Sequence, residues 1–577
     1  MTGMSSGRVP NIWMNVTTSA NWTRAAVGIV RVEQEICREL ELLYGKRFRK
    51  CVFQNGEFVP FEGRFGASSV PQGVIWPDGS RDFPKTYALD PAFGGNRAST
   101  TPNDPVAQTR EPSINQYPRL SDIGSIGIEY GDVLISVGLD WDHSYIDKFY
   151  ELKKRMGIRI VACCYDLIPV LYPQYCVGHV AAGFKEYFGK LSWSSSTMLC
   201  ISNQSRKDYR ELVRRIGAPE IPSVVIPLGD KVPDAEGEIS TQIRRLADKP
   251  YILFVSTIER RKNHEVLYRA YHLLAKAGHA DKLPKLVFVG MPGWGVGDLL
   301  KDIELDPLTD GLIVQLNHVD DAELSYLYHN ATFMAYPSLY EGWGLPVGEA
   351  LACGKAVVAS AQGSIPEVGG DLVVYVDPWN AQAWADEILR LIENPDELKA
   401  LEDAIVKGYK SRTWFDTAKA VKDAVDALGP VESKPLILLP GYDMRTMSGI
   451  HCGEAMRSRG DKGVFLFGPY WPLAKGSYSI AIDMQKIGTA AGELNISVVH
   501  NHGLVELNAK KIIFHRGDEF EGHININIEN SENIKDLEIV FESTDGLLVS
   551  VDKIIISNVN FETQSGHLEK RRAFGPT

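Results

Sequence analysis

The chain has 577 residues, which is too long for one hydrophobic core and predicts about three to four domains. Hydrophobic residues make up 44% and charged residues 23%, the composition of a soluble globular protein. The net charge of -12 disfavours nucleic-acid binding, because a negative protein repels a phosphate backbone. The sequence shows neither an apolar run of about 18 residues nor a signal peptide, so no membrane span is expected. The 8 scattered cysteines form no CxxC pair and predict reduced thiols in the cytoplasm.

Short β-branched runs alternate with helix-period segments from about residue 12 to residue 400, which predicts two parallel α/β units in succession. In the first unit the expected strands cover residues 12–17, 132–137, 159–166, 198–202 and 224–227. The expected helices cover residues 29–43, 145–156 and 204–216. An alternating segment at 50–61 predicts a hairpin, and the Pro/Gly/Ser/Asn-rich passage at 66–123 predicts a long surface loop or lid.

The second unit repeats this pattern, and the two units meet near residues 230–249. Its expected strands cover residues 251–256, 285–289, 312–316, 332–336, 356–359 and 372–376. Its expected helices cover residues 264–277, 322–329 and 381–392. From about residue 434 apolar residues alternate at period two without a long helix, which predicts an all-β sandwich. The predicted domains are therefore two Rossmann-like units, 1–235 and 236–430, followed by a β domain at 431–577.

The segment with the most chemical information follows the expected strand at 332–336. It reads Tyr336-Pro-Ser-Leu-Tyr-Glu341-Gly-Trp-Gly-Leu-Pro-Val-Gly-Glu349. Glycines in a loop allow close backbone approach, and a helix that starts at Gly344-Leu345-Pro346 offers N–H groups with partial positive charge, which suits a diphosphate. Glu349 could accept hydrogen bonds from ribose hydroxyls, and Glu341 could hold hydroxyls of a sugar. A merely capped helix with favourable acidic residues is the alternative.

A cationic pair, Arg261 and Lys262, stands where another expected strand gives way to a helix. Two cations at a helix start oppose the helix dipole, so they need a compensating anion unless they are simply solvated. Arginine offers a bidentate fork to phosphate oxygens and lysine a point charge. The pair therefore predicts a phosphate-binding corner.

Together these segments resemble glycosyltransferase family 4, whose members are retaining enzymes of the GT-B fold. The resemblance rests on the Glu341-x7-Glu349 pair and on Phe254-Val-Ser-Thr-Ile-Glu-Arg-Arg-Lys-Asn263, and extends over about residues 10–425. It implies that Arg261 and Lys262 grip the donor diphosphate, although Thr257 stands where many members carry arginine. It also implies that residues 316–319, including His318 and Val319, seat the base, and that Trp343, Gly344 and Leu345 lie at the donor.

The resemblance is weaker in the first unit. Gly28 opens a helix as in the first loop of the family, where glycine lets the backbone approach phosphate or acceptor; a simple turn is the alternative. Asp166 lies in Cys164-Tyr-Asp-Leu-Ile-Pro169, similar to a family segment that often has histidine in place of Tyr165. We expect Asp166 to orient the sugar or the acceptor.

Two other patterns are given less weight. Asp140-Trp141-Asp142 is a D-x-D pair, which holds a divalent ion in sugar transferases of another fold, but we expect acceptor recognition here and no catalytic metal. The histidines, among them His318, are spaced too irregularly for a metal site.

The resemblance implies a retaining transfer in which the departing phosphate accepts the acceptor proton, without metal or cofactor. The variant at 259–263 is similar to that of bacterial enzymes that build surface polysaccharides, which favours GDP-mannose as donor and a saccharide or lipid-linked oligosaccharide as acceptor. Peripheral contact with the inner face of the membrane is left open, and so is the oligomeric state.

Two other functions stay open. The protein could bind carbohydrate through its β domain on an inactive scaffold, with Phe467, Tyr470, Trp471 and Tyr478 stacking on sugars; packing of these rings in the core is the competing explanation. A sugar phosphorylase of the same architecture is the other alternative.

Overall fold

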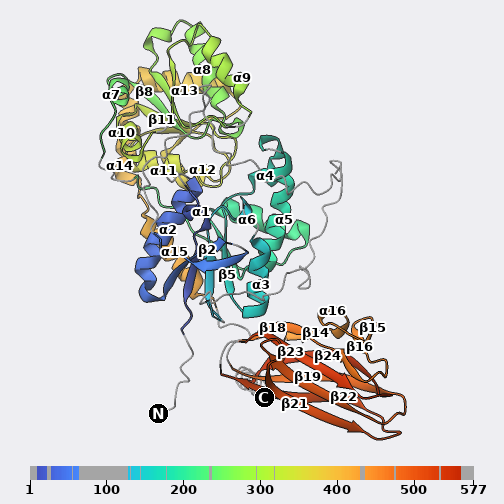
Figure 1. The fold of residues 1–577 in the computed structure, drawn as a ribbon. Coiled ribbons are helices and arrows are strands. Elements are labelled where there is room, and N and C mark those ends of the chain that lie inside the picture. Colours follow the sequence, from blue (N-terminus) through green and yellow to red (C-terminus); the bar gives the residue numbers. More distant parts are fainter. Residues whose placement is uncertain are drawn as a thin grey trace, which may run out of the picture.

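The computed structural model describes residues 9–22, 28–54, 56–63, 128–129, 131–142, 145–176, 178–232, 237–293, 295–317, 319–428, 436–473, 476–531 and 534–559. The expected loop at 66–123 lies outside the described residues. Two α/β units follow one another along the chain, and a β unit follows them (Figure 1).

The first unit is built on a seven-stranded sheet in the order β3-β2-β1-β4-β5-β6-β7. The strands are β1 (Ile12–Asn15), β2 (Phe48–Gln54), β3 (Glu57–Pro60), β4 (Val133–Ser136), β5 (Arg159–Cys164), β6 (Thr197–Cys200) and β7 (Ser223–Val225). The expected hairpin is confirmed as the antiparallel pair of β2 and β3, and the other pairs are parallel.

Helices cover both faces of this sheet. They are α1 (Thr17–Ala20), α2 (Gly28–Tyr44), α3 (Ile146–Met156), α4 (Ile168–Leu171), α5 (Gly178–Ser194) and α6 (Asn203–Ile216). Met14 of β1 packs in one core cluster with residues of α2, whereas Trp13 packs in another with residues of α3 and α5. Burial on both faces explains why the strands are almost wholly apolar rather than alternating.

The second unit has a parallel six-stranded sheet in the order β10-β9-β8-β11-β12-β13. The strands are β8 (Tyr251–Val255), β9 (Lys285–Val289), β10 (Ile313–Leu316), β11 (Phe333–Tyr336), β12 (Val357–Ala359) and β13 (Val374–Tyr375). The helices are α7 (Thr241–Ala247), α8 (His264–Lys276), α9 (Gly297–Leu305), α10 (Asp321–Asn330), α11 (Leu345–Ala352), α12 (Ile365–Gly369), α13 (Ala381–Glu393) and α14 (Pro395–Gly408). The predicted pair of Rossmann-like units is thus confirmed.

Helix α15 (Trp414–Asp426) returns to the first unit and packs against α2, as Figure 1 shows. Thr417 Oγ1 of α15 donates to the carbonyl of Pro227 at 2.9 Å. The chain therefore crosses between the units twice. Helix α15 thus precedes the proposed boundary at residue 430 but packs on the first unit. The boundary itself stays a prediction.

The last unit is built on two β sheets, as predicted, and also contains a short helix. One sheet runs β15-β16-β24-β19-β22 with β14 paired to β24, and the other runs β17-β23-β20-β21 with β18 paired to β23. The elements are β14 (Leu436–Leu438), α16 (Pro440–Asp443), β15 (Ile450–Cys452), β16 (Ala455–Arg457), β17 (Gly463–Leu466), β18 (Pro469–Leu473), β19 (Gly476–Ile487), β20 (Gly492–His500), β21 (Val505–Phe514), β22 (Glu521–Asn530), β23 (Ile534–Ser543) and β24 (Leu548–Asn558). Both sheets contribute to one apolar core, and β18 contacts α3 of the first unit.

Within the described residues, every helix is too short or too polar to cross a lipid bilayer.

Candidate active site

The loop that follows β11 carries the Glu341 motif and is held in place by the start of α12. Ser364 Oγ donates to the carbonyls of Glu341 and Trp343 at 2.9 and 3.1 Å. Gly363 has φ +62°, and a Cβ there would meet the carbonyl oxygen of Glu341 at 2.4 Å. Because these contacts fix the loop backbone, the Glu341 carboxylate has a defined position.

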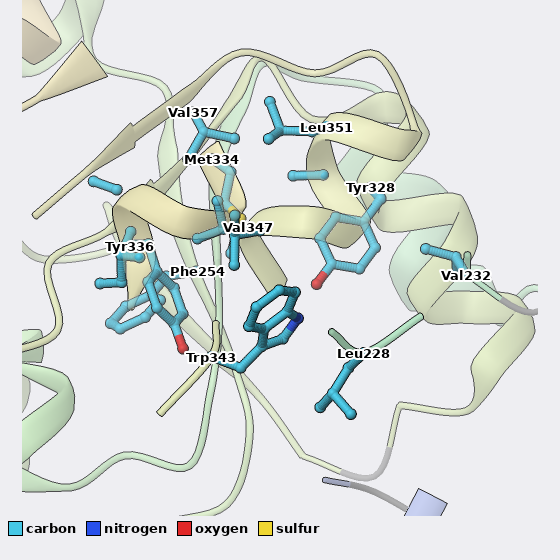
Figure 2. Close-up of a cluster of buried hydrophobic side chains, with 14 of the residues drawn as sticks. Leu228, Val232, Phe254, Tyr328, Met334, Tyr336, Trp343, Val347, Leu351 and Val357 are labelled. Atoms are coloured by element: carbon cyan, nitrogen blue, oxygen red, sulfur yellow. The ribbon is translucent and has the colours of Figure 1, made fainter. Parts of the chain in front are cut away.

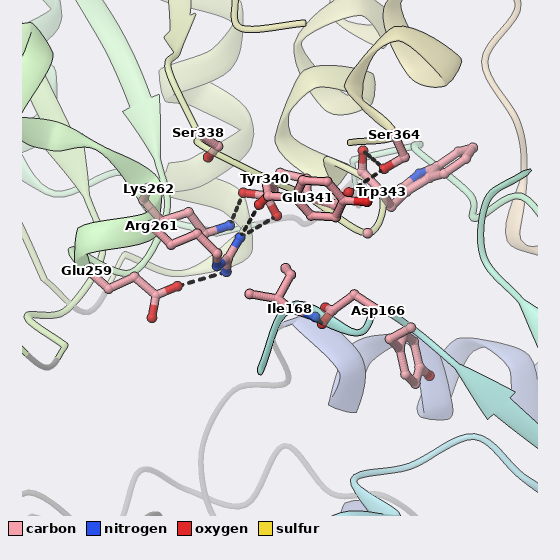
Figure 3. Close-up of polar contacts among 12 residues, drawn as sticks. Asp166, Ile168, Glu259, Arg261, Lys262, Ser338, Tyr340, Glu341, Trp343 and Ser364 are labelled. Atoms are coloured by element: carbon pink, nitrogen blue, oxygen red, sulfur yellow. Dashed lines mark hydrogen bonds and ion pairs between the residues drawn. The ribbon is translucent and has the colours of Figure 1, made fainter. Parts of the chain in front are cut away.

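Glu341 forms ion pairs with both predicted cations (Figure 3). Arg261 Nη1 lies 2.9 Å from Glu341 Oε2, and Lys262 Nζ lies 2.6 Å from Oε1. The Tyr336 hydroxyl also donates to Oε1 at 3.1 Å, and Arg261 makes a second ion pair with Glu259 at 2.8 Å. Arg261 and Lys262 are only 16% and 13% exposed, so they do not form a solvated helix start.

The pKa values in this cluster favour the charged forms of Glu341 and Arg261. Burial alone would raise the pKa of Glu341, but Arg261 and Lys262 outweigh it and hold the pKa at about 2. Burial acts to lower the pKa of Arg261, yet Glu341 and Glu259 raise it overall. Burial and the neighbouring Arg261 lower the pKa of Lys262. The corner therefore holds two cations paired with the carboxylates of Glu341 and Glu259, and an anionic ligand would share the cations with these carboxylates.

Glu349 lies on α11 and uses both carboxylate oxygens. Tyr328 of α10 donates its hydroxyl to Oε2 at 2.7 Å, and Arg31 of α2 lies 3.1 Å from Oε1. Burial raises the pKa of Glu349, while Arg31 and Tyr328 oppose this shift. The predicted ribose ligand is thus paired to a residue of the first unit.

Asp166 follows β5 and reaches the same corner from the first unit. Its Oδ1 accepts the backbone N–H of Ile168 at 3.0 Å, and burial raises its pKa against the opposing charge of Arg261. Gly342 packs so closely that a Cβ there would meet the Tyr165 carbonyl at 2.4 Å and Asp166 Cβ at 2.9 Å. The structure therefore brings together Asp166, Arg261, Lys262 and Glu341, residues that the sequence analysis had nominated separately.

Further contacts join the two units beside this corner. Tyr340 donates its hydroxyl to Asp208 of α6 at 2.5 Å. The carboxylate of Glu367 accepts the backbone N–H groups of Asn203 and Gln204, both at 2.8 Å, and so caps α6 from the other unit. All these residues follow the carboxyl ends of parallel strands, so these edges of the two sheets face each other.

The helix start predicted at Gly344 is present. Gly344 takes the position before α11 with φ +110°, which favours glycine, and Leu345 and Pro346 begin the helix. Trp343 is 4% exposed within the apolar cluster drawn in Figure 2, and among the described residues its Nε1–H has no hydrogen-bond partner. Arg412 lies over the indole at 5.5 Å from the ring centroid.

The surroundings of the remaining nominated residues differ from one residue to the next. Gly28 begins α2 with φ +52°, and a Cβ there would meet nothing within 4 Å. Val319 is half-buried against the main core, and His318 lies outside the described residues. The carboxylate of Asp140 is buried and accepts the hydroxyls of Ser136 and Tyr145 at 2.8 and 2.6 Å.

The aromatic side chains that could bind sugars differ in burial, since Trp141, Phe467 and Tyr470 are half-buried whereas Trp471 and Tyr478 are buried. Trp141 lies 5.2 Å from the ring of Phe184. In the β unit Trp471 and Tyr478 are 5% and 7% exposed and belong to the core between the sheets. Within the part of the chain that the structure describes, no group of three or more His, Cys, Asp or Glu side chains is arranged to hold a metal ion.

Sequence reasoning missed Arg31 and Glu367, which connect the two units. Arg31 lies in the first turns of α2, where a cation opposes the helix dipole, and this is the signal that pointed to Arg261 and Lys262. Glu367 carried no such signal, because an acidic residue near a helix start is expected without any partner.

Comparisons with known proteins bear on this site. The model of the family described as "Glycosyl transferases group 1" matches residues 236–410, which contain the Arg261, Lys262, Glu341 and Glu349 positions. The O-antigen chain mannosyltransferase B of Escherichia coli is 34% identical over 291 residues, covering 50% of this chain and 74% of that protein. The serotype-specific mannosyltransferase WbdA of Escherichia coli is 29% identical over 272 residues, covering 45% of this chain and 31% of that protein.

Among solved structures, the sucrose-phosphate synthase of Thermosynechococcus elongatus matches with a TM-score of 0.48 and 18% identity, over 72% of this chain and 98% of that one. That likeness is too distant to support a conclusion about this chain. The extended similarity to the first mannosyltransferase and the family match over the second unit agree with the two facing Rossmann-like units. The chain therefore belongs to the glycosyl transferases group 1 family and is a glycosyltransferase of GT-B architecture.

Proposed function

We propose that the protein transfers mannose from GDP-mannose, with retention of the anomeric configuration, to a saccharide or lipid-linked saccharide in bacterial surface polysaccharide synthesis. The observation that carries this proposal is the meeting of two buried cations with Glu341 at the boundary of the two units, opposite Asp166. The names of the relatives, an O-antigen chain mannosyltransferase and a serotype-specific mannosyltransferase, support the choice of donor and pathway class.

The donor would lie on the second unit. Arg261 and Lys262 would hold the diphosphate, together with the start of α11 at Gly344 and Leu345. Glu349 would accept the ribose hydroxyls, and the segment that includes Val319 would seat the base. Glu341 would hold hydroxyls of the transferred sugar, and the acceptor would approach over the first unit near Gly28 and Asp166.

The same-face route is what the family resemblance implies, and the ionised state of Glu341 is compatible with it. A carboxylate whose pKa lies at about 2 is a poor proton acceptor near neutral pH, so it does not suit a general base. The departing phosphate would accept the acceptor proton instead. Catalysis would then come mainly from positive charge that stabilises the leaving diphosphate. This chemistry needs no metal or cofactor.

The proposal is tested by a panel of sugar nucleotides in two assays. GDP at about 100 times its Kd should stabilise the folded protein by about 2.7 kcal/mol and raise the melting temperature more than UDP or dTDP at equal concentration. GDP-mannose should be hydrolysed slowly without acceptor, and proton NMR of the product formed with acceptor should show an α-linkage. No stabilisation by any nucleotide would contradict the function, and release of sugar only in the presence of phosphate would indicate a phosphorylase.

A further inference from the structure

An ion pair connects the two α/β units at the proposed ribose site. Arg31 Nη1 on α2 lies 3.1 Å from Glu349 Oε1 on α11, and the two side chains are only 12% and 7% exposed. Arg31 Nη2 also lies 3.4 Å from the carbonyl oxygen of Lys231. The guanidinium therefore has partners from both units.

This arrangement gives each oxygen of Glu349 a partner and leaves the side chain only 7% exposed. Oε2 accepts the hydroxyl of Tyr328, which is fully buried, and Oε1 faces Arg31. Since Arg31 comes from the other unit, it covers the side of the carboxylate that faces the first unit. A ribose diol that approaches between the units would compete with the guanidinium for this oxygen.

We infer that Arg31 is a positioning residue that competes with the nucleotide for Glu349, so that binding of a nucleoside diphosphate releases one of the contacts that join the units. This inference rests on the proposed function, because it takes Glu349 as the ribose ligand. When the ribose hydroxyls donate to Glu349, Arg31 gives up its contact with this carboxylate. It keeps the carbonyl of Lys231 and the attraction of Glu35 on the same helix.

The competing role for Arg31 is that of a third cation for the diphosphate. The two roles predict opposite changes in nucleotide affinity. Removal of a competitor makes binding tighter, whereas removal of a phosphate ligand makes it weaker. The structure favours competition, because Arg31 contacts the glutamate itself, while Arg261 and Lys262 gather at Glu341.

The test is isothermal titration calorimetry with GDP on the full chain. Arg31→Gln should bind GDP about tenfold more tightly than the wild type, which equals about 1.4 kcal/mol. Arg31→Lys should fall between them, because lysine keeps the charge but not the fork. The control is Glu367→Gln, which weakens the other junction at the start of α6. Its Kd should stay within about twofold of the wild-type value, and thermal melting should show that each variant is folded.

A double-mutant cycle gives the deciding comparison. In a Glu349→Gln background, Arg31→Gln should leave the Kd unchanged, because no carboxylate remains to compete for. Weaker binding by Arg31→Gln would overturn the inference while leaving the proposed function in place. Equal tightening in Arg31→Gln and Glu367→Gln would assign the effect to general opening of the units, which also overturns it. Failure of every variant, including the wild type, to bind GDP would overturn both proposals.

Discussion

Replacement of Lys262 by methionine removes one positive charge from the candidate active site and keeps most of the side-chain volume. Lys262 Nζ lies 2.6 Å from Glu341 Oε1, and the lysine is 13% exposed. At an effective dielectric constant of about 20, two unit charges at this distance interact by about 6 kcal/mol. Most of this is offset by the cost of burying the lysine, and Arg261 still pairs with Glu341 in the variant. We therefore expect the free energy of unfolding to fall by only about 1–3 kcal/mol.

The effect on turnover should be larger than the effect on folding. A preorganised donor that stabilises developing negative charge contributes about 2–4 kcal/mol to the transition state, so kcat should fall by about 30- to 1000-fold. The assay is release of GDP from GDP-mannose at saturating donor, with circular dichroism to confirm the fold. Lys276→Met is the matched control, since Lys276 is exposed in the last turn of α8, the helix that follows Lys262. If Lys262→Met kept more than about a third of wild-type turnover, the assignment of the diphosphate site would be wrong.

Three further predictions concern domain closure, pH and the β unit. Gly342→Ala should lower turnover and increase the radius of gyration in X-ray scattering, because its Cβ would meet the Tyr165 carbonyl at 2.4 Å and push the two α/β units apart. The control is Gly183→Ala, whose Cβ would meet nothing within 4 Å. An unchanged radius of gyration in Gly342→Ala would contradict a close approach of the two units at this glycine. Burial raises the pKa of Glu33 to about 8 from 4.5, so the folded state binds a proton that the unfolded state has lost between these values. The free energy of unfolding should therefore fall by up to a few kcal/mol as pH rises from about 4.5 to 8. Urea unfolding at pH 5.5 and 8 should show a smaller fall in Glu33→Gln than in the wild type. An equal fall in the two proteins would refute this prediction. Trp471→Ala should lower the free energy of unfolding by about 3–5 kcal/mol, measured by urea unfolding, whereas a loss of sugar binding with unchanged stability would favour a surface role for the ring.

The local patterns of the sequence determined the elements of the fold. Apolar runs buried on both faces indicated the parallel strands, and period two indicated the β unit, because both patterns reflect which faces of an element are buried. The glycines and the proline around Gly344 also indicated the start of α11, since backbone conformation depends on neighbours in the chain. Glu341, Arg261 and Lys262 could be nominated because each lies where a strand meets a helix.

Only the tertiary structure decided which charges meet. Arg31 and Glu349 are 318 residues apart, and no periodicity relates them. Their pairing depends on how the two units are placed, as does the close approach of Gly342 to Asp166. The placement of Trp471 in the core likewise depends on how the two β sheets stack. Sequence patterns report the burial of each element, whereas contacts between elements depend on a packing geometry that arises only when the whole chain is folded.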